Sequence, residues 1–129
     1  GVYAFGQASD MDKFAPKAVL TSVENNWGPY YVDRVKAVAN GTWGQKDTWH
    51  GIGDGMVVIS DLDNSIPADV RAKVNQLEKD LASGKVHSFT GPIYDQQGNL
   101  MVAEGQTADD GMLAGMMTYV KGVEGDIPK

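Results

Sequence analysis

The sequence predicts an α/β fold with a largely parallel sheet, and two observations indicate it. Short apolar runs of strand length alternate along the chain with segments whose apolar residues recur every three or four positions, the spacing of one helix face. The run Gly55–Leu62 (GMVVISDL) is apolar on both of its alternating faces, as is typical of a strand buried inside a parallel sheet. Strands that alternate with helices are the usual pattern of this fold class.

Two strands and a helix are predicted in the first forty residues. Val2–Gly6 and Val19–Val23 are short apolar runs, and each is followed by polar residues. Pro29 then indicates the start of a helix, because proline has no N–H to lose at the first helical position. Asn40 and Gly41 indicate its end. The apolar face of this helix consists of Tyr31, Val35 and Val38.

The second half of the chain predicts a second helix and a hairpin. Ser65 and Pro67 begin the helix and Gly84 ends it. The segment 89–102 (FTGPIYDQQGNLMV) has the pattern of a hairpin that turns at 97–99, where Gln, Gly and Asn stand together. The apolar face of the helix consists of Val70, Val74, Leu77 and Leu81.

A third helix is predicted near the end of the chain. Thr107 with Asp110 resembles a capping box, in which the two side chains satisfy backbone groups at a helix start. The residues 124–129 (EGDIPK) are expected to form a frayed tail. The expected apolar face of the helix consists of Leu113, Met116, Met117 and Val120, and its methionines are interpreted as core residues.

Composition limits the classes of partner. The chain has 129 residues, which fits one domain, and its net charge is -6 with a pI of about 4.7. An acidic surface repels phosphate backbones and anionic headgroups, so nucleic acid is not expected as a partner. There is no cysteine, which excludes disulfides and thiolate metal sites. No apolar run approaches the ~20 residues that a membrane-spanning helix needs.

The first residues suggest that the chain belongs to a larger gene product. The sequence starts with GVYAFG, which has no initiator methionine and already reads as part of a strand. We therefore expect a fragment or an excised domain.

Two polar loops are the candidate binding site. In open α/β sheets, ligands bind beyond the carboxyl ends of the strands. Amide, hydroxyl and carboxylate groups there can fix the edge of a heterocycle, and a tryptophan can cover its flat face. The alternative is that these residues only end strands and cap helices, which is the commoner use. The candidate ligand-binding residues are Gln7, Ser9 and Asp10 after the first strand, and Asn25, Asn26 and Trp27 after the second.

Other motifs carry weaker signals. Asp47 and His50 could form a catalytic dyad, but no nucleophile with a supporting oxyanion loop is recognisable. His87 stands far from His50, and two distant histidines make a poor metal site. The glycines of GIGDG (51–55) precede a strand, whereas a dinucleotide fingerprint follows one. Neither a metal nor a cofactor is therefore expected.

Several motifs in one order resemble a known family. They are YAFGQASDM, LTSVENNWGPYY, GTWGQKDTWHGIGDGMV, IPADV and FTGPIYDQQG, and they extend over essentially the whole chain. This pattern is similar to the carboxyl-terminal part of the basic membrane protein family, the purine- and purine-nucleoside-binding components of bacterial ABC importers.

The resemblance implies a fold and a function. Members are similar to type I periplasmic binding proteins, in which two α/β lobes joined by crossover strands close on a ligand. Residues 1–129 would supply the second lobe and the last crossovers, and the first lobe would be absent. The implied partners are a purine ligand, the missing first lobe and an ABC permease. The implied location is the periplasm or, for a lipoprotein, the outer side of the cytoplasmic membrane.

Two departures from the family pattern concern the ligand. Nucleoside-binding members resemble GVDSDQ where this chain has 6–11 (GQASDM), and they carry a lysine where Asn25 stands. The first Asp and the lysine are the groups expected to hold ribose hydroxyls, and the loss of each such anchor costs of order 1–3 kcal/mol. With Ala8 and Asn25 in their place, the resemblance implies a free purine base, adenine first, and no enzymatic activity. The alternatives are a hydrolase or transferase using Asp47 and His50, and a receptor module of the same fold.

Overall fold

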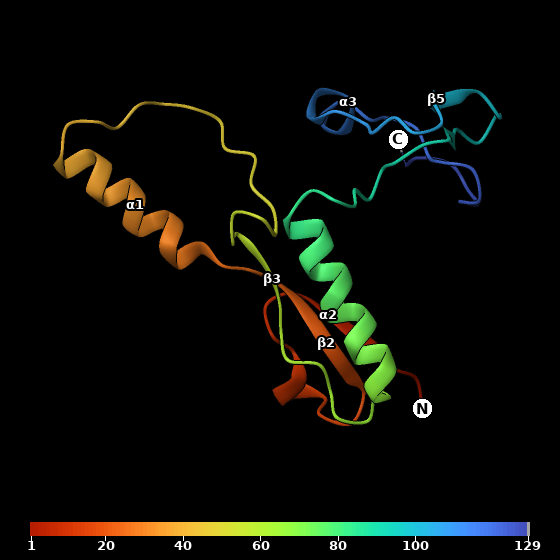
Figure 1. The fold of residues 1–129 in the computed structure, drawn as a ribbon, viewed down its shortest axis with the longest axis horizontal. Helices are drawn as coiled ribbons and strands as arrows, with labels where there is room; N and C mark the ends of the chain where they lie inside the picture. Colours follow the sequence, from red (N-terminus) through yellow and green to blue (C-terminus); the bar gives the residue numbers. More distant parts are fainter. Residues whose placement is uncertain (129) are drawn as a thin grey trace. The chain divides into compact units, whose positions relative to one another are not determined.

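The computed structural model describes residues 1–128, and the chain falls into two compact units, Gly1–Lys85 and the residues from Val86 onward (Figure 1). Lys129, the last residue of the expected tail, lies outside the described residues. The rest of that tail has no helix or strand. No helix in residues 1–128 is long and apolar enough to cross a membrane.

The first unit contains a mixed sheet of three strands. They are β1 (Ala4–Ala8), β2 (Val19–Asn25) and β3 (Val57–Ile59), in the order β1-β2-β3. A 3-10 helix, η1 (Asp12–Phe14), lies in the connection between β1 and β2. The strand β1 pairs parallel with β2, and β3 pairs antiparallel with β2. The α/β class is confirmed, with a sheet that is mixed.

The first two strands are close to the prediction. The strand β1 begins and ends two residues later than predicted, and β2 extends two residues further, so Asn25 is its last residue. An extended β2 is possible because its end is paired on both sides: Glu24 lies opposite Ala8 in β1 and opposite Val58 in β3.

The prediction of a long third strand, buried on both faces of a parallel sheet, is wrong. The strand β3 has three half-buried residues and runs antiparallel to β2. Its regular pairing stops after Ile59 because the Ser22 N–H donates to the Ser60 side-chain Oγ, at 2.8 Å, in place of a backbone carbonyl. Antiparallel pairing follows from the connection: the chain returns through a long loop to the carboxyl end of β2, where the Asn26 N–H donates to the Met56 carbonyl at 2.7 Å.

The first helix, α1 (Trp27–Ala39), begins two residues before Pro29. Proline fits there as well, because the first four N–H groups of a helix have no partner within it. Its end is as predicted, with Asn40 as C-cap and Gly41 at a φ of +66°. The helix has no buried residue, and Val35 in the middle of its apolar face is 69% exposed.

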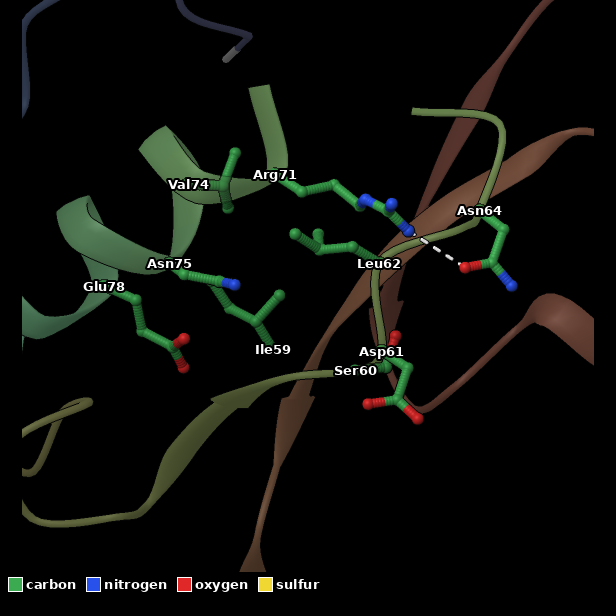
Figure 2. A pocket seen from close by; sticks show the side chains of 9 residues that line it. All are labelled: Ile59, Ser60, Asp61, Leu62, Asn64, Arg71, Val74, Asn75 and Glu78. Carbon is green, nitrogen blue, oxygen red and sulfur yellow. Dashed lines mark hydrogen bonds between the residues drawn. The ribbon is translucent and has the colours of Figure 1, made fainter. Parts of the chain in front are cut away.

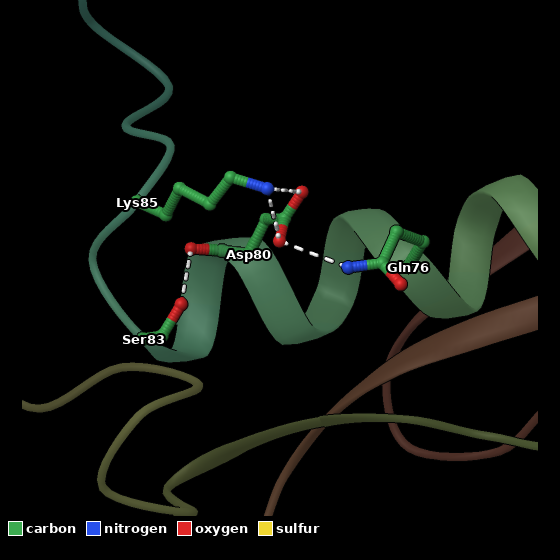
Figure 3. A network of polar contacts seen from close by, with 4 residues as sticks. All are labelled: Gln76, Asp80, Ser83 and Lys85. Carbon is green, nitrogen blue, oxygen red and sulfur yellow. Dashed lines mark hydrogen bonds and ion pairs between the residues drawn. The ribbon is translucent and has the colours of Figure 1, made fainter.

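The second helix, α2 (Ala68–Ala82), matches the prediction. Pro67 is its N-cap, and Gly84 follows its end at a φ of +71°. Asp69 and Lys73 form an i,i+4 pair at 3.9 Å whose side chains are 73% and 80% exposed. Figure 3 shows the other end of α2, where the Asp80 carboxylate accepts hydrogen bonds from Lys85 Nζ at 3.1 and 3.2 Å and from Gln76 Nε2 at 3.0 Å.

The second unit contains the predicted hairpin, β4 (Ile93–Tyr94) and β5 (Leu100–Val102), paired antiparallel. Asp95 holds its turn, because Oδ1 accepts the N–H groups of Gln97 and Asn99 at 2.9 and 2.8 Å. The hydrogen bond from the Asn99 side chain, followed by these backbone hydrogen bonds, lowers the pKa of Asp95. Gly98 adopts a φ of +86° at the turn.

The predicted third helix is much shorter than expected. The helix α3 (Asp110–Ala114) has five residues, and its N-cap is Asp109, which accepts the Met112 N–H at 2.7 Å. Thr107 instead forms a bridge with Thr90, and Val120 forms one with Asp95. The helix ends early because Gly115 is unfavourable in a helix interior and because Val120 is held by the hairpin.

Little of the chain is buried. The apolar side chains in the core are Val19 in the first unit and Val102 and Ala108 in the second. Many large apolar side chains are exposed, among them three that line one face of α1: Tyr31, Val35 and Val38. Such a surface is typical of elements that pack against further protein.

Asp80 provides a test of the end of α2. The hydrogen bond from Lys85, followed by the one from Gln76, lowers its pKa from the ordinary value of 3.8. A carboxylate with a lowered pKa stabilises the fold above its unfolded pKa, and that stabilisation is lost as the pH falls through the folded pKa. We expect Asp80→Asn to lower the free energy of unfolding of the protein near neutral pH, with a difference that shrinks below about pH 4.

Urea titrations across this pH range measure the effect. Asp69→Asn is the comparison variant: both members of its ion pair are solvated, and only its place in the first turn of α2 favours the charge, so it should change stability less than Asp80→Asn does. A destabilisation by Asp80→Asn that is independent of pH would contradict the assignment.

Candidate functional site

The sheet brings three segments of the chain to one edge. In the parallel register, Ala8 lies opposite Glu24, so the residues that follow β1 and β2 leave the sheet side by side. In the antiparallel register, Asn25 lies opposite Val57, so the loop before β3 reaches the same edge. The carboxyl ends of β1 and β2 and the amino end of β3 therefore form a common edge, which we call the strand-end edge.

The loop after β1 is tightly folded. Ala8 adopts a φ of +69°, a left-handed conformation that is strained for a residue with a Cβ. The Ser9 hydroxyl donates to the Met11 sulfur at 3.7 Å, and Asp10 Oδ1 accepts the Asp12 N–H at 3.2 Å. Gln7 is exposed within β1. Strain of this kind is commonly found at functional sites.

The asparagines at the end of β2 have different positions. Asn25 is the last strand residue, and its side chain lines a hollow at the edge. Asn26 is the N-cap of α1 by position, but its side chain makes no capping hydrogen bond. Its Nδ2 instead donates to the Gly55 carbonyl at 3.1 Å. Asn26 therefore ties the start of α1 to the loop before β3.

Trp27 belongs to an aromatic cluster on the first turn of α1. Its ring stacks on that of Tyr31 with centroids 5.8 Å apart and meets the Tyr30 ring edge-on at 5.9 Å. The Arg34 guanidinium lies 5.2 Å from the Tyr30 ring centroid. Trp27 remains 47% exposed, so one part of a fixed ring faces the solvent at the strand-end edge. Fixed aromatic rings are suited to covering a flat ligand.

Two hollows lie beside these residues. The larger has a volume of about 470 Å³ and is lined by Asn25, Trp27 and part of the loop before β3. The smaller has about 90 Å³ and is lined by Asn26 and Arg34 among others. Several lining residues were not among the candidates that the sequence indicates: Tyr30, Arg34, Lys46, Thr48 and Met56. Only the Gly-rich sequence before β3 could have pointed to some of them.

The two predicted loops line different parts of this edge. Neither of the two hollows described above includes Gln7, Ser9 or Asp10, and no side-chain hydrogen bond in residues 1–128 joins these residues to Asn25, Asn26 or Trp27. The strand register alone brings them to the same edge.

Asp47 and His50 both line the larger hollow. No hydrogen bond between them is present in the described part of the chain, and neither is paired with a nucleophile there. Within residues 1–128 no group of three or more His, Asp and Glu side chains is placed to hold a metal ion. The geometry at this edge is suited to hydrogen bonding and stacking.

A third hollow, of about 500 Å³, lies between β3 and α2 (Figure 2). Arg71 and Val74 of α2 face Ile59 and Leu62 across it, and Arg71 Nη1 donates to Asn64 Oδ1 at 2.9 Å. The segment after β3 runs toward the start of β2, where the Asp63 N–H donates to the Leu20 carbonyl. This hollow is therefore away from the strand-end edge.

Comparisons with known proteins identify a family and two relatives. The model of the Bmp family, described as ABC transporter substrate-binding protein PnrA-like, matches residues 1–97. A purine-binding protein of Brucella abortus is 46% identical over 129 residues, all of this chain and 37% of its own length. A protein of Haloferax volcanii that carries the name of an ABC transporter glucose-binding protein is 22% identical over 99% of this chain and 30% of its own.

A solved structure shares the fold. A transcriptional activator of the comK gene from Bacillus halodurans matches 67% of this chain and 30% of its own with a TM-score of 0.59. At 19% identity this likeness shows the fold alone. The chain spans about a third of the length of the relatives that it matches.

The backbone of Ala8 gives a prediction for this edge. A residue with a Cβ at this φ is strained by about 1 kcal/mol, and glycine is not. We expect Ala8→Gly to leave the free energy of unfolding of the protein unchanged or to raise it by up to about 0.5 kcal/mol in urea denaturation, because the relieved strain is partly offset by the about 0.5–1 kcal/mol that glycine costs in a strand. Ala4→Gly in the same strand is the control and should lower it by about 0.5–1 kcal/mol. A loss of stability in both variants would contradict the strained conformation.

Proposed function

This chain belongs to the Bmp family of PnrA-like ABC transporter substrate-binding proteins, and we propose that it forms part of a protein that captures a purine and delivers it to a permease. The observation that carries the proposal is the strand-end edge, where polar loops and a fixed tryptophan meet in a chain that is 46% identical to a purine-binding protein. The proposed ligand-binding residues are Gln7, Ser9, Asp10, Asn25, Asn26 and Trp27.

The proposed work is binding without covalent chemistry. A binding protein needs hydrogen-bond donors and acceptors for the ligand edge and a flat apolar surface for its face. The amide of Asn25 and the carboxylate of Asp10 would supply the first, and the indole of Trp27 would supply the second. Neither a resident cofactor nor a metal is part of the proposal.

We favour a free base such as adenine over a nucleoside. The resemblance to nucleoside-binding members leads us to expect an aspartate and a lysine that hold ribose, at the positions where this chain has Ala8 and Asn25. The methyl group of Ala8 cannot accept a hydrogen bond from a ribose hydroxyl. The Asn25 amide carries no positive charge. A sugar buried without these partners would lose affinity, because each unmade hydrogen bond to a buried polar group is costly.

We further propose that residues 1–129 are the second lobe and crossovers of a two-lobed protein. The matched relatives are about three times as long as this chain, and the apolar face of α1 is exposed over Tyr31, Val35 and Val38. A first lobe would complete the cleft, and closure of the two lobes would enclose the ligand. Delivery to a permease implies the periplasm or, with a lipid anchor, the outer side of the cytoplasmic membrane.

Calorimetry on the full-length protein tests the ligand. We expect adenine to bind at least about tenfold more tightly than adenosine, because the anchors for ribose are replaced. Glucose serves as a negative control, because one relative is named for binding it. Tighter binding of adenosine than of adenine would refute the preference for a free base. Binding of glucose without binding of adenine or adenosine would refute the proposal that the ligand is a purine.

A gain-of-function variant tests the two replaced anchors. We expect Ala8→Asp combined with Asn25→Lys to raise the affinity for adenosine by about tenfold or more, because each restored hydrogen bond contributes of order 1–3 kcal/mol. Aspartate also tolerates the left-handed backbone at position 8. Ala72→Asp with Asn75→Lys introduces the same charges on exposed positions of α2 and should leave the affinity unchanged. An equal gain in both double variants would indicate a nonspecific charge effect.

The rival enzymatic function has its own test. We expect the full-length protein to release no base from adenosine during long incubation, as followed by chromatography. Release that is abolished by His50→Ala would instead support a hydrolase or transferase that uses Asp47 and His50. A purine-dependent rise in melting temperature, together with no turnover, would favour a binding protein over a module that has lost its ligand.

A further inference from the structure

Ser22 is an unusual residue for the middle of a strand. Among residues 1–128 it is the polar side chain that is completely enclosed, with 0% exposure. A buried hydroxyl is costly unless it is hydrogen-bonded, so its partners reveal its role.

Both partners of the Ser22 hydroxyl lie in the loop after β1. Oγ accepts the Met11 N–H at 3.1 Å and donates to Asp10 Oδ1 at 3.2 Å. The Ser22 hydroxyl thus uses both its proton and one of its acceptor positions on this loop, which carries the proposed ligand-binding residue Asp10. The backbone of Ser22 is held separately, because its N–H donates to Ser60 Oγ at 2.8 Å.

Gly6 makes this arrangement possible. It lies directly opposite Ser22 in the parallel register. A Cβ at position 6 would overlap the Ser22 Oγ and come within 2.8 Å of its Cβ and 2.9 Å of Met11 Cγ. The loop can therefore fold back over β1 only because position 6 has no side chain.

The two oxygens of the Asp10 carboxylate therefore have different hydrogen-bond partners. Asp10 Oδ1 accepts two hydrogen bonds, from the Ser22 hydroxyl and from the Asp12 N–H. Oδ2 accepts none from the residues that the structure describes, and Asp10 is half-buried. Fixing one oxygen sets the direction in which the other can accept a hydrogen bond.

We propose that Ser22 is a positioning residue that orients Asp10 so that Oδ2 accepts an N–H group of the bound purine. This inference rests on the proposed function. It specifies the ligand edge as a hydrogen-bond donor, which suits a free base: its imidazole ring carries an N–H that a nucleoside has lost to the glycosidic bond. The role of Ser22 is indirect, because its own hydroxyl is fully used by the loop.

A double-mutant cycle on the full-length protein tests the inference, with adenine affinity measured by calorimetry. Ser22→Ala removes the hydroxyl but keeps the backbone N–H bond to Ser60. We expect it to weaken adenine binding at least tenfold, and Asp10→Ala to weaken it at least as much. In the Asp10→Ala background, Ser22→Ala should cause no further loss, because Ser22 acts through Asp10.

Thr21→Val is the matched control for loss of stability alone. It removes the hydrogen bond from Thr21 Oγ1 to the Ser60 carbonyl at 2.9 Å and the contact of Thr21 Oγ1 with the Ser60 hydroxyl at 3.3 Å, without touching Asp10. We expect it to leave the affinity for adenine unchanged. Unchanged affinity in Ser22→Ala, or additive losses in the double variant, would overturn the inference while the proposed function stands. A wild-type protein that binds no purine would overturn the proposed function, and with it the role in binding.

Amide hydrogen exchange examines the Ser22–Asp10 contact without ligand. The Met11 amide should exchange at least tenfold faster in Ser22→Ala than in wild type, and as slowly as wild type in Thr21→Val. If exchange at Met11 is the same in all three proteins, Ser22 does not hold the loop and the inference fails whatever the ligand is.

Discussion

The parallel pairing of β1 with β2 is the constraint on which the first unit depends, and the contact between Gly6 and Ser22 lies at its centre. A side chain at position 6 would occupy the space of the Ser22 hydroxyl. With glycine there, the loop after β1 folds back and its backbone and carboxylate satisfy that hydroxyl. The same register sets Ala8 beside Glu24, so that both strands end together. The geometry of the loop after β1, which is one part of the candidate site, therefore follows from one close approach between two strands.

The antiparallel β3 adds the second part of the site. In a parallel arrangement, the loop before β3 would lie at the opposite end of β2. Because β3 runs antiparallel, Met56 and Gly55 meet Asn26, and the loop with Asp47 and His50 lines the hollow beside Trp27. Asp47 and His50, which the sequence suggests only weakly as a catalytic pair, thus lie beside two of the proposed binding residues, Asn25 and Trp27. Their contribution to such a hollow is shape and polarity, which fits a binding protein as well as an enzyme.

Much of the local structure could be predicted from sequence, and each miss has a physical cause. The helix α2 and the hairpin around Gly98 carry their own start, stop and turn residues, so local chemistry was sufficient. The start of α1 was misplaced by two residues because Pro29 fits several positions of a first turn. The long helix expected around Leu113 stops at Ala114, since a bridge from Val120 to Asp95 outweighs the periodicity of the sequence. For the candidate site, polar residues at the ends of the first two strands were proposed from sequence, whereas Tyr30 was not, because no local pattern marks it as a residue that lines a hollow.

By itself, the sequence determined the α/β class, the family and the polar character of the strand ends, because these depend on periodicity, motif order and residue type. Only the tertiary structure decided the direction of β3, the left-handed backbone at Ala8 and the enclosure of Ser22. Each of these arises from contacts between residues far apart in the chain, such as Ser22 with Asp10 and Ser60. A hydroxyl in a strand has no local signature that tells whether it faces solvent or another strand's loop. The environment of such a hydroxyl is determined when the strands pair. At Ser22 the hydroxyl is enclosed because Gly6, on the neighbouring strand, has no side chain.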